Sequence, residues 1–232
     1  MPICRGRQRS GGISGLLGAR TDLWSIRSGT PLVSNLLTRF CSSCDAQRAG
    51  LVPTSPSANL GRQTRPPYDA RAVANFFLDL ADEERVQLTQ MSLLKLIYFA
   101  HGWHLARCAS PLVRQDFEAW PYGPVIKVVR DEFSEFGDTA ISGRATRFDL
   151  IAGCRHVVRP ELMEQDQAFV RTIFKAYHGY SAWQLSELTH EAGSPWDRLW
   201  NSESPVGRLA LRLRNEDIRA HFVSISQRLR LS

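Results

Sequence analysis

The residue types best suited to chemistry stand close together in the middle of the sequence. His101, His104 and Cys108 lie at positions i, i+3 and i+7, so a helix carries all three on one face. Zinc accepts nitrogen and sulfur ligands of these types. No second ligand pair with zinc-site spacing follows, and a histidine on an apolar helix is more often a hydrogen-bonded core residue. A metal-dependent enzyme using these three residues is therefore the weakest hypothesis, and we expect neither a metal nor a cofactor.

Two further groups give weaker chemical signals. Thr189, His190 and Glu191 form an acid–base run, but no second motif supplies a nucleophile or an orienting group. Cys41 and Cys44 have the spacing of a metal or redox pair, but the partner pair is missing from the sequence. The sequence also lacks a glycine-rich phosphate loop and a nucleophile signature. We therefore predict a protein that is not an enzyme and has no catalytic residue.

Two helices are predicted to position the histidines and their surroundings. Apolar residues from Val73 to Leu80 recur at helix spacing and predict the first of them. A broad apolar face over Thr89 to Cys108 predicts the second, which we expect to be central and well buried. Lys95 and Tyr98 are three residues apart on this helix, so we expect them to form one exposed polar edge beside the apolar face.

A run of five residues beyond this helix predicts a fixed turn. Trp120 to Pro124 contains two prolines and a glycine, a composition that opposes regular structure. Gly123 permits a backbone geometry that is costly for other residues. Pro124 is predicted to open a helix that Gly137 ends. A pre-shaped aromatic loop loses little entropy on binding, so we expect this turn to lie beside a partner-binding surface.

The remaining sequence predicts mostly helices joined by short irregular segments. In chain order we predict a small hairpin within 141–159, helices over 161–177 and from Ser181, an irregular stretch after Pro195 and Trp196, a brief strand over 209–213, and a last helix capped by Asn215. The expected fold class is therefore mainly α, a compact multi-helix domain with a minor β element.

The first 67 residues differ from the rest of the chain in charge and composition. The whole chain carries a formal charge of +6, but residues 1–67 hold nine arginines, no lysine and two acidic residues, and so carry +7. They also contain only two of the 22 aromatic residues. Too little apolar surface is present there to offset the entropy of ordering the chain. We predict that residues 1–67 are either a disordered arm or a start-site extension, and that 68–232 form one domain.

The charge of the folded part limits its expected partners. Residues 68–232 carry a formal charge of −1, so the basic character of the whole chain does not indicate a phosphate-binding surface on that domain. We expect the domain not to bind nucleic acid. No stretch reaches the roughly 20 apolar residues of a membrane span. Five cysteines are few and odd in number, which favours a reducing cytoplasm over a disulfide framework.

Three sequence motifs, taken in order, resemble those of a known family. The first runs from Leu94 to Leu105, the second from Glu118 to Val125, and the third combines Leu188 to Glu191 with Pro195 and Trp196. Together they resemble the Panacea antitoxin domain, which is also known as the SocA-like or GepA-like family and formerly as a DUF4065 domain. The resemblance covers most of the part of the chain that we expect to fold.

The resemblance implies a bacterial or prophage-borne antitoxin that neutralises a cognate toxin by direct protein–protein binding. SocA-type members are also linked to delivering a toxin to a AAA+ protease, so a proteolysis adaptor is the alternative. Modular members of the family carry further DNA-binding segments, whereas this chain has no recognisable helix-turn-helix outside the domain.

Aromatic and cationic side chains near the motifs are the candidates for contact with the toxin, because such residues dominate interface energetics. Core packing is the favoured role of Trp120 and Trp196, while core packing and contact are equally expected for Tyr122. The partner-binding candidates are Trp120, Tyr122, Lys95, Tyr98, His190 and Trp196.

Overall fold

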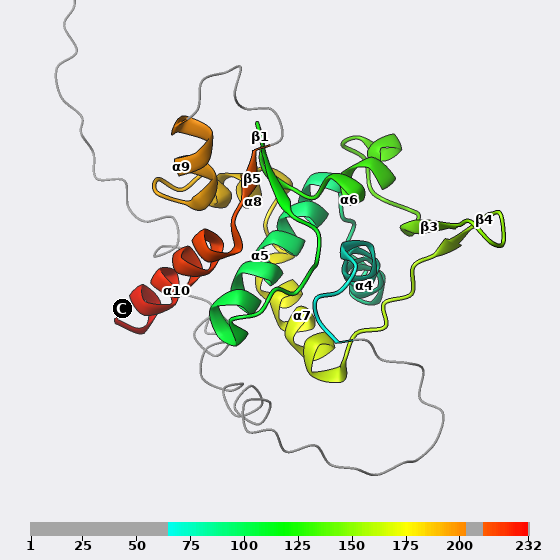
Figure 1. Ribbon diagram of the computed structural model, residues 1–232, viewed down its shortest axis with the longest axis horizontal. Coiled ribbons are helices and arrows are strands. Elements are labelled where there is room, and N and C mark those ends of the chain that lie inside the picture. The colour runs from blue at the N-terminus through cyan, green and yellow to red at the C-terminus, as the bar shows by residue number, and fades with distance from the viewer. Residues whose placement is uncertain (1–64, 203–210, 232) are drawn as a thin grey trace, which may run out of the picture.

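The computed structural model describes residues 65–202 and 211–231, which form a helical body with two small sheets (Figure 1). The prediction of a mainly α domain with a minor β element is confirmed. The helices in these ranges are α4 (Ala70–Glu83), α5 (Gln90–Cys108), α6 (Lys127–Glu132), the 3-10 helix η1 (Ser134–Phe136), α7 (Glu164–Tyr177), α8 (Ala182–Thr189), α9 (Pro195–Ser202) and α10 (Asn215–Leu231). The strands are β1 (Phe117–Trp120), β2 (Gly123–Val125), β3 (Thr146–Asp149), β4 (Cys154–Val157) and β5 (Arg212–Leu213).

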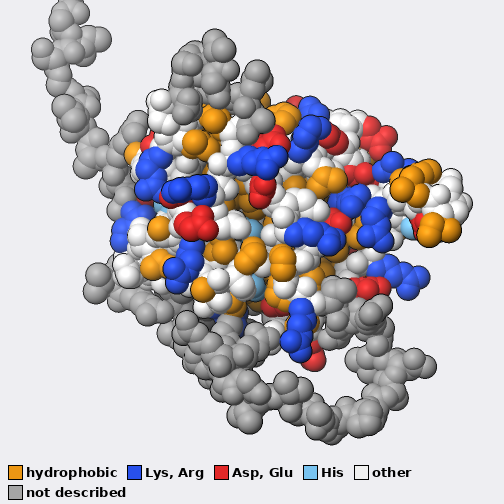
Figure 2. All heavy atoms as spheres, in the orientation of Figure 1, with side chains coloured by type: hydrophobic (Ala, Val, Ile, Leu, Met, Phe, Trp, Pro, Cys, Tyr) orange, Lys and Arg blue, Asp and Glu red, His pale blue; other side chains and the backbone are white. Residues whose placement is uncertain are grey.

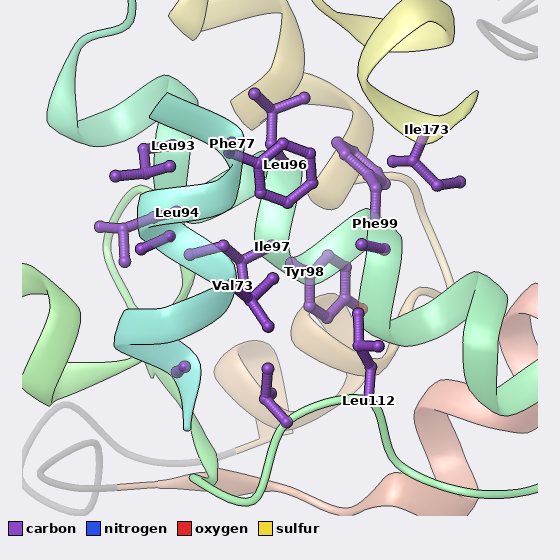
Figure 3. Close-up of a cluster of buried hydrophobic side chains, with 14 of the residues drawn as sticks. Val73, Phe77, Leu93, Leu94, Leu96, Ile97, Tyr98, Phe99, Leu112 and Ile173 are labelled. Atoms are coloured by element: carbon purple, nitrogen blue, oxygen red, sulfur yellow. The ribbon is translucent and has the colours of Figure 1, made fainter. Parts of the chain in front are cut away.

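Helix α5 is the centre of the molecule, as its sequence predicts. Helices α4, α7, α8 and α10 all contact it (Figure 1). Thr89 begins the helix, because its hydroxyl accepts a hydrogen bond from the amide of Ser92. Every residue from Ser92 to Leu105 is buried, which is the behaviour of a helix that is apolar all round. Figure 3 shows its side chains packed among those of α4 and α7, with Leu93, Leu94, Leu96, Ile97, Tyr98 and Phe99 labelled beside Val73, Phe77 and Ile173.

Capping side chains explain where the neighbouring helices begin. The Asp69 carboxylate accepts a hydrogen bond from the amide of Arg71 and so opens α4. Ser181 and Gln184 satisfy each other's backbone amides in a capping box at the start of α8. The apolar stripe of α4 faces the core, because Val73, Phe76, Phe77 and Leu80 are all buried. Both helices therefore confirm the sequence prediction.

The strands form two separate antiparallel sheets. One sheet has the order β2-β1-β5, and its first two strands form a hairpin in which Trp120 lies opposite Gly123. The other consists of β3 and β4, with Thr146 opposite Val157, and projects from the body near α4 (Figure 1). The hairpin predicted within 141–159 is confirmed. The brief strand predicted over 209–213 is confirmed at its last two residues, and the first two lie outside the described residues.

Two local predictions are wrong at prolines. Pro124 does not open a helix but lies in β2, and the next helix begins at Lys127. Because β2 is the outer strand of its sheet, a residue without an amide hydrogen is tolerated there. The stretch after Pro195 and Trp196 is not irregular as far as Ser202, because it forms α9, and 203–210 lie outside the described residues. Its start is stabilised by the Ser194 hydroxyl, which accepts a hydrogen bond from the amide of Asp197 at 3.1 Å, and proline suits a first helical turn.

The predicted arm lies outside the described residues except for its last three positions, so the arm and the domain boundary at residue 68 stay predictions. Among the described residues, no helix combines the length and the apolar character that crossing a membrane requires.

Candidate functional site

Side chains of three helices hold the Trp120–Pro124 turn from its core side. Lys95 on α5 donates a hydrogen bond from Nζ to the last carbonyl of the turn, at 3.1 Å. Ser186 on α8 donates its hydroxyl to the middle carbonyl, at 2.8 Å. The indole nitrogen of Trp196 on α9 donates to the first carbonyl, also at 2.8 Å. Every second carbonyl of the turn is therefore fixed by a side chain, which makes the turn a rigid element.

Gly123 allows this turn to approach α8 closely. Its φ of +100° lies in a region that L side chains rarely adopt. A Cβ atom built there lies 2.4 Å from Thr189 Oγ1 and 2.8 Å from Lys95 Nζ, which is closer than van der Waals contact permits. The Thr189 hydroxyl is itself fixed, because it donates to the Ser186 carbonyl at 2.7 Å. Both backbone geometry and packing therefore require glycine at this position.

Lys95 and Tyr98 do not form an exposed edge, and this prediction is wrong. Lys95 is 1% exposed and Tyr98 is 2% exposed, because α5 is surrounded on all sides by other elements. Burial lowers the pKa of Lys95 to about 7. The Tyr98 ring packs edge-on against Phe117, with ring centroids 5.3 Å apart. Lys95 supports the turn from below, and Tyr98 belongs to the core.

His190 and Trp196 stack against each other beneath the turn, with ring centroids 3.9 Å apart. Trp196 is buried and His190 half-buried. Burial, and then the nearby charge of Lys95, lower the pKa of His190. Trp120 is half-buried; its indole nitrogen donates to Glu118 at 2.9 Å, and the guanidinium of Arg130 lies over its ring. These three rings therefore hold the turn in place, and the core-packing role favoured for the two tryptophans agrees with their position.

Two aromatic side chains reach solvent at this place. Tyr122 is 61% exposed at the tip of the turn, and Trp183 on α8 is 58% exposed. Trp183 lies three residues before Ser186, whose hydroxyl holds the Tyr122 carbonyl, and its indole nitrogen donates to Glu187 at 3.1 Å. We call Tyr122 and Trp183 the turn surface. Trp183 was not among the sequence candidates, although helix spacing places it on the side of α8 opposite Leu185 and Leu188.

His101 and His104 have structural hydrogen bonds. His101 Nδ1 accepts from the Val113 amide, and its Nε2 lies 2.9 Å from Asn215 Oδ1, so Asn215 binds this histidine at the start of α10. Burial lowers the pKa of His101 to about 4. His104 Nδ1 lies 2.7 Å from the carbonyl of Ser110. Among the described residues, no three side chains of metal-binding types come together.

The fold does not assemble Thr189, His190 and Glu191, the acid–base run for which the sequence offered no second motif. His190 turns toward Trp196, whereas Glu191 turns toward α10, where its carboxylate lies 3.3 Å from the guanidinium of Arg228. Thr189 points at the turn. The three side chains therefore serve three different contacts. Cys41 and Cys44 lie outside the described residues.

Comparison with known proteins identifies the family. A family model described as "Antitoxin SocA-like, Panacea domain" matches residues 93–197. Antitoxin SocA of Caulobacter vibrioides (strain NA1000 / CB15N) is 36% identical to this chain over 154 residues, which are 66% of this chain and 82% of that protein. The chain belongs to the SocA-like antitoxin family with a Panacea domain. No solved structure matches it.

The SocA-like segment includes the whole turn and its supports. It runs from α5 into the first turn of α9, so it contains both Tyr122 and Trp183 of the turn surface. It also contains the β3–β4 hairpin. The resemblance stated from the three sequence motifs is confirmed.

Proposed function

We propose that this chain is an antitoxin that neutralises a cognate toxin protein by binding it directly. The observation that carries the proposal is the 36% identity with Antitoxin SocA over 82% of that protein. Family membership fits the exposure of aromatic side chains on a rigid turn, because such side chains contribute much of the binding energy at protein interfaces.

The turn surface is the proposed contact within this function. Tyr122 and Trp183 are exposed, and the backbone that carries Tyr122 is fixed by three side-chain hydrogen bonds. A pre-ordered contact loses little conformational entropy on binding. Of the other sequence candidates, Trp120 and His190 lie half-buried at its edge. Lys95 and Trp196 act as supports below it, and the buried Tyr98 takes no part in contact.

The function is tested by rescue of growth. The probe is the product of the reading frame adjacent to the gene of this chain, expressed alone and together with the chain. We expect growth arrest by the probe alone, normal growth on co-expression, and co-purification of the two proteins as a stoichiometric complex. Continued arrest in the presence of well-expressed chain contradicts the proposal.

Delivery of the toxin to a AAA+ protease is the alternative function. An adaptor needs a second protein surface, and the described residues have exposed apolar side chains on the β3–β4 hairpin as well as at the turn. The half-life of the toxin in cells separates the two functions. A simple neutraliser leaves the toxin bound and as long-lived as before, whereas an adaptor shortens its half-life in a protease-dependent manner.

A further inference from the structure

The β3–β4 hairpin exposes an unusual amount of apolar side chain. Of the six large hydrophobic side chains that are exposed within the described residues, four belong to this hairpin. Leu150 is 88% exposed and Ile151 is 100% exposed at its tip, and Phe148 and Val157 are each more than half exposed on its strands. Figure 2 shows hydrophobic atoms at the projecting end of the molecule that carries the hairpin. Such a concentration marks a site of interaction.

The turn of the hairpin does not itself require apolar residues. Asp149 Oδ1 accepts hydrogen bonds from the amides of Ile151 at 2.8 Å and Ala152 at 3.1 Å. Gly153 supplies the positive φ that completes the turn. Leu150 and Ile151 therefore contribute no side-chain contact to the turn, and polar residues would form it equally well. Their apolar character has no explanation in the folding of the hairpin.

The base of the hairpin is held by hydrogen bonds to a buried asparagine and by a salt bridge at the surface. Asn75 on α4 is 1% exposed, and its amide nitrogen donates to the carbonyls of Ala145 at 2.9 Å and Val158 at 2.7 Å. Its amide oxygen accepts from the Ala145 amide at 2.7 Å. Glu132 on α6 forms a salt bridge with Arg155 of β4 at 2.7 Å. The hairpin is thus fixed to α4 and α6 before any partner arrives, which lowers the entropy cost of docking through its tip.

Two arginines beside the groove at the base of the hairpin have no salt bridge within the described residues, whereas the acidic residues that line the same groove, Asp69, Asp149 and Glu161, all interact with other groups. These arginines are Arg147 and Arg159, and both are exposed. The acidic residue of the hairpin, Asp149, keeps its charge, because the two turn amides that donate to its Oδ1 lower its pKa. The groove has a volume of about 920 Å³ and lies between the hairpin and the start of α4, and both arginines line it together with Tyr68. The complementary surface is an apolar projection or pocket with carboxylates at its rim.

Charge and size decide which molecule fits this surface. A second copy of the chain, docked hairpin to hairpin, would bring exposed arginines together, and their charges repel. Residues 1–67 of the same chain carry nine arginines and so would meet charge of their own sign at this surface. Recruitment to an anionic membrane takes clusters of about four or more cations, and among the described residues only two arginines without a salt bridge lie here, Arg147 on β3 and Arg159 just beyond β4. The turn surface has two exposed aromatic side chains, whereas a stable interface takes roughly 20 residues a side. A toxin bound at the turn therefore needs further contact surface.

We infer that the β3–β4 hairpin is a docking arm for the toxin, whose matching surface is apolar and rimmed by carboxylates. The inference rests on the proposed function, because its occupant is the toxin. Leu150 and Ile151 supply the apolar contact, and Arg147 and Arg159 supply the charge complementarity.

The test compares full-length variants in binding and rescue. The double variant Leu150→Ser/Ile151→Ser is expected to keep the unfolding midpoint, since both side chains are exposed, and to bind the growth-arresting product of the adjacent reading frame at least about tenfold more weakly. Arg147→Glu is expected to weaken binding and to flatten its dependence on salt. Arg219→Glu is the matched control, because Arg219 is exposed on α10 and makes the same change of charge away from the hairpin.

The outcomes separate this inference from the proposed function. If the unaltered chain neither binds the probe nor rescues growth, both fail together. If the unaltered chain rescues growth and the double variant binds the probe equally well, the docking arm for the toxin is wrong; retained rescue then leaves the function intact, and loss of rescue assigns the hairpin to the protease of the adaptor alternative. Sedimentation with phosphatidylglycerol vesicles that is lost in the double variant, while toxin binding is kept, also overturns the inference in favour of a membrane. Loss of toxin binding with an unchanged unfolding midpoint supports it.

Discussion

The turn surface and the β3–β4 hairpin both present apolar side chains to solvent, but the two regions are held in different ways. The turn lies directly on the core, with Gly123 pressed against Lys95 and Thr189. The hairpin stands away from the core and is attached through Asn75 at its base. Packing therefore constrains which residue types the turn can contain. Residues at the hairpin tip have no packing to satisfy, so their chemistry is better evidence of binding.

The two glycines of these regions give the largest expected contrast. Gly123→Ala is expected to lower the free energy of unfolding by about 2 to 5 kcal/mol, since the strain of a positive φ adds to overpacking against Thr189. Gly153→Ala in the hairpin is the matched control. Its φ is also positive, but nothing lies within 4 Å of its added Cβ, so we expect a loss of about 1 kcal/mol. Chemical denaturation measures the free energy of unfolding of both variants. Equal losses would mean that the turn is no more tightly packed against the core than the hairpin.

Lys95 makes the support of the turn sensitive to pH. Its pKa is about 7 in the folded chain, below the ordinary value of 10.5, so folding releases a proton from the lysine. Stability is therefore lowest below pH 7 and rises with pH between the two values, by up to about 1.4 kcal/mol per pH unit. Lys95→Met is expected to flatten this slope. Denaturation of both proteins at pH values below the ordinary tyrosine pKa of about 10 tests the claim. If the free energy of unfolding rises with pH equally steeply in both proteins, Lys95 stays charged in the folded chain and the cost of burying its charge is offset by its surroundings.

Asn75 tests the attachment of the hairpin. Asn75→Ala leaves the Ala145 amide and the Val158 carbonyl without a partner, while the Ala145 carbonyl keeps the Val158 amide at 3.0 Å, and is expected to cost about 3 kcal/mol. Amide hydrogen exchange should rise in residues 146–157 more than in α5. An unchanged exchange rate in the hairpin would mean that Glu132 and Arg155 suffice to hold it.

Sequence periodicity was enough to predict the helical frame. The apolar stripe of α4 and the apolar run of α5 give unambiguous helix spacing, and Ser181 marks the start of α8. The errors fall at Pro124 and Pro195, where a proline fits either a strand edge or a helix start and local sequence does not distinguish the two.

The site was predictable in part. Two prolines and a glycine identify the Trp120–Pro124 turn, but the burial of Lys95 was missed because lysine is almost always exposed. The apolar residues on both sides of Lys95 were the available signal. The hairpin tip was missed for another reason: β3 and β4 pack no face against the core, so no alternation of buried and exposed residues marks Leu150 and Ile151.

Tyr122 gives the smallest expected change in stability and the sharpest test of the turn surface. Its ring is 61% exposed while its carbonyl is held by Ser186, so Tyr122→Ala removes side-chain contact and keeps the backbone support. We expect the free energy of unfolding to change by less than about 0.5 kcal/mol, and toxin binding to weaken about tenfold. Tyr122→Phe is the control that keeps the ring. A loss of several kcal/mol in Tyr122→Ala would make this residue structural, like Gly123 beside it. A stable variant with full rescue would leave the hairpin tip as the surface that binds the toxin.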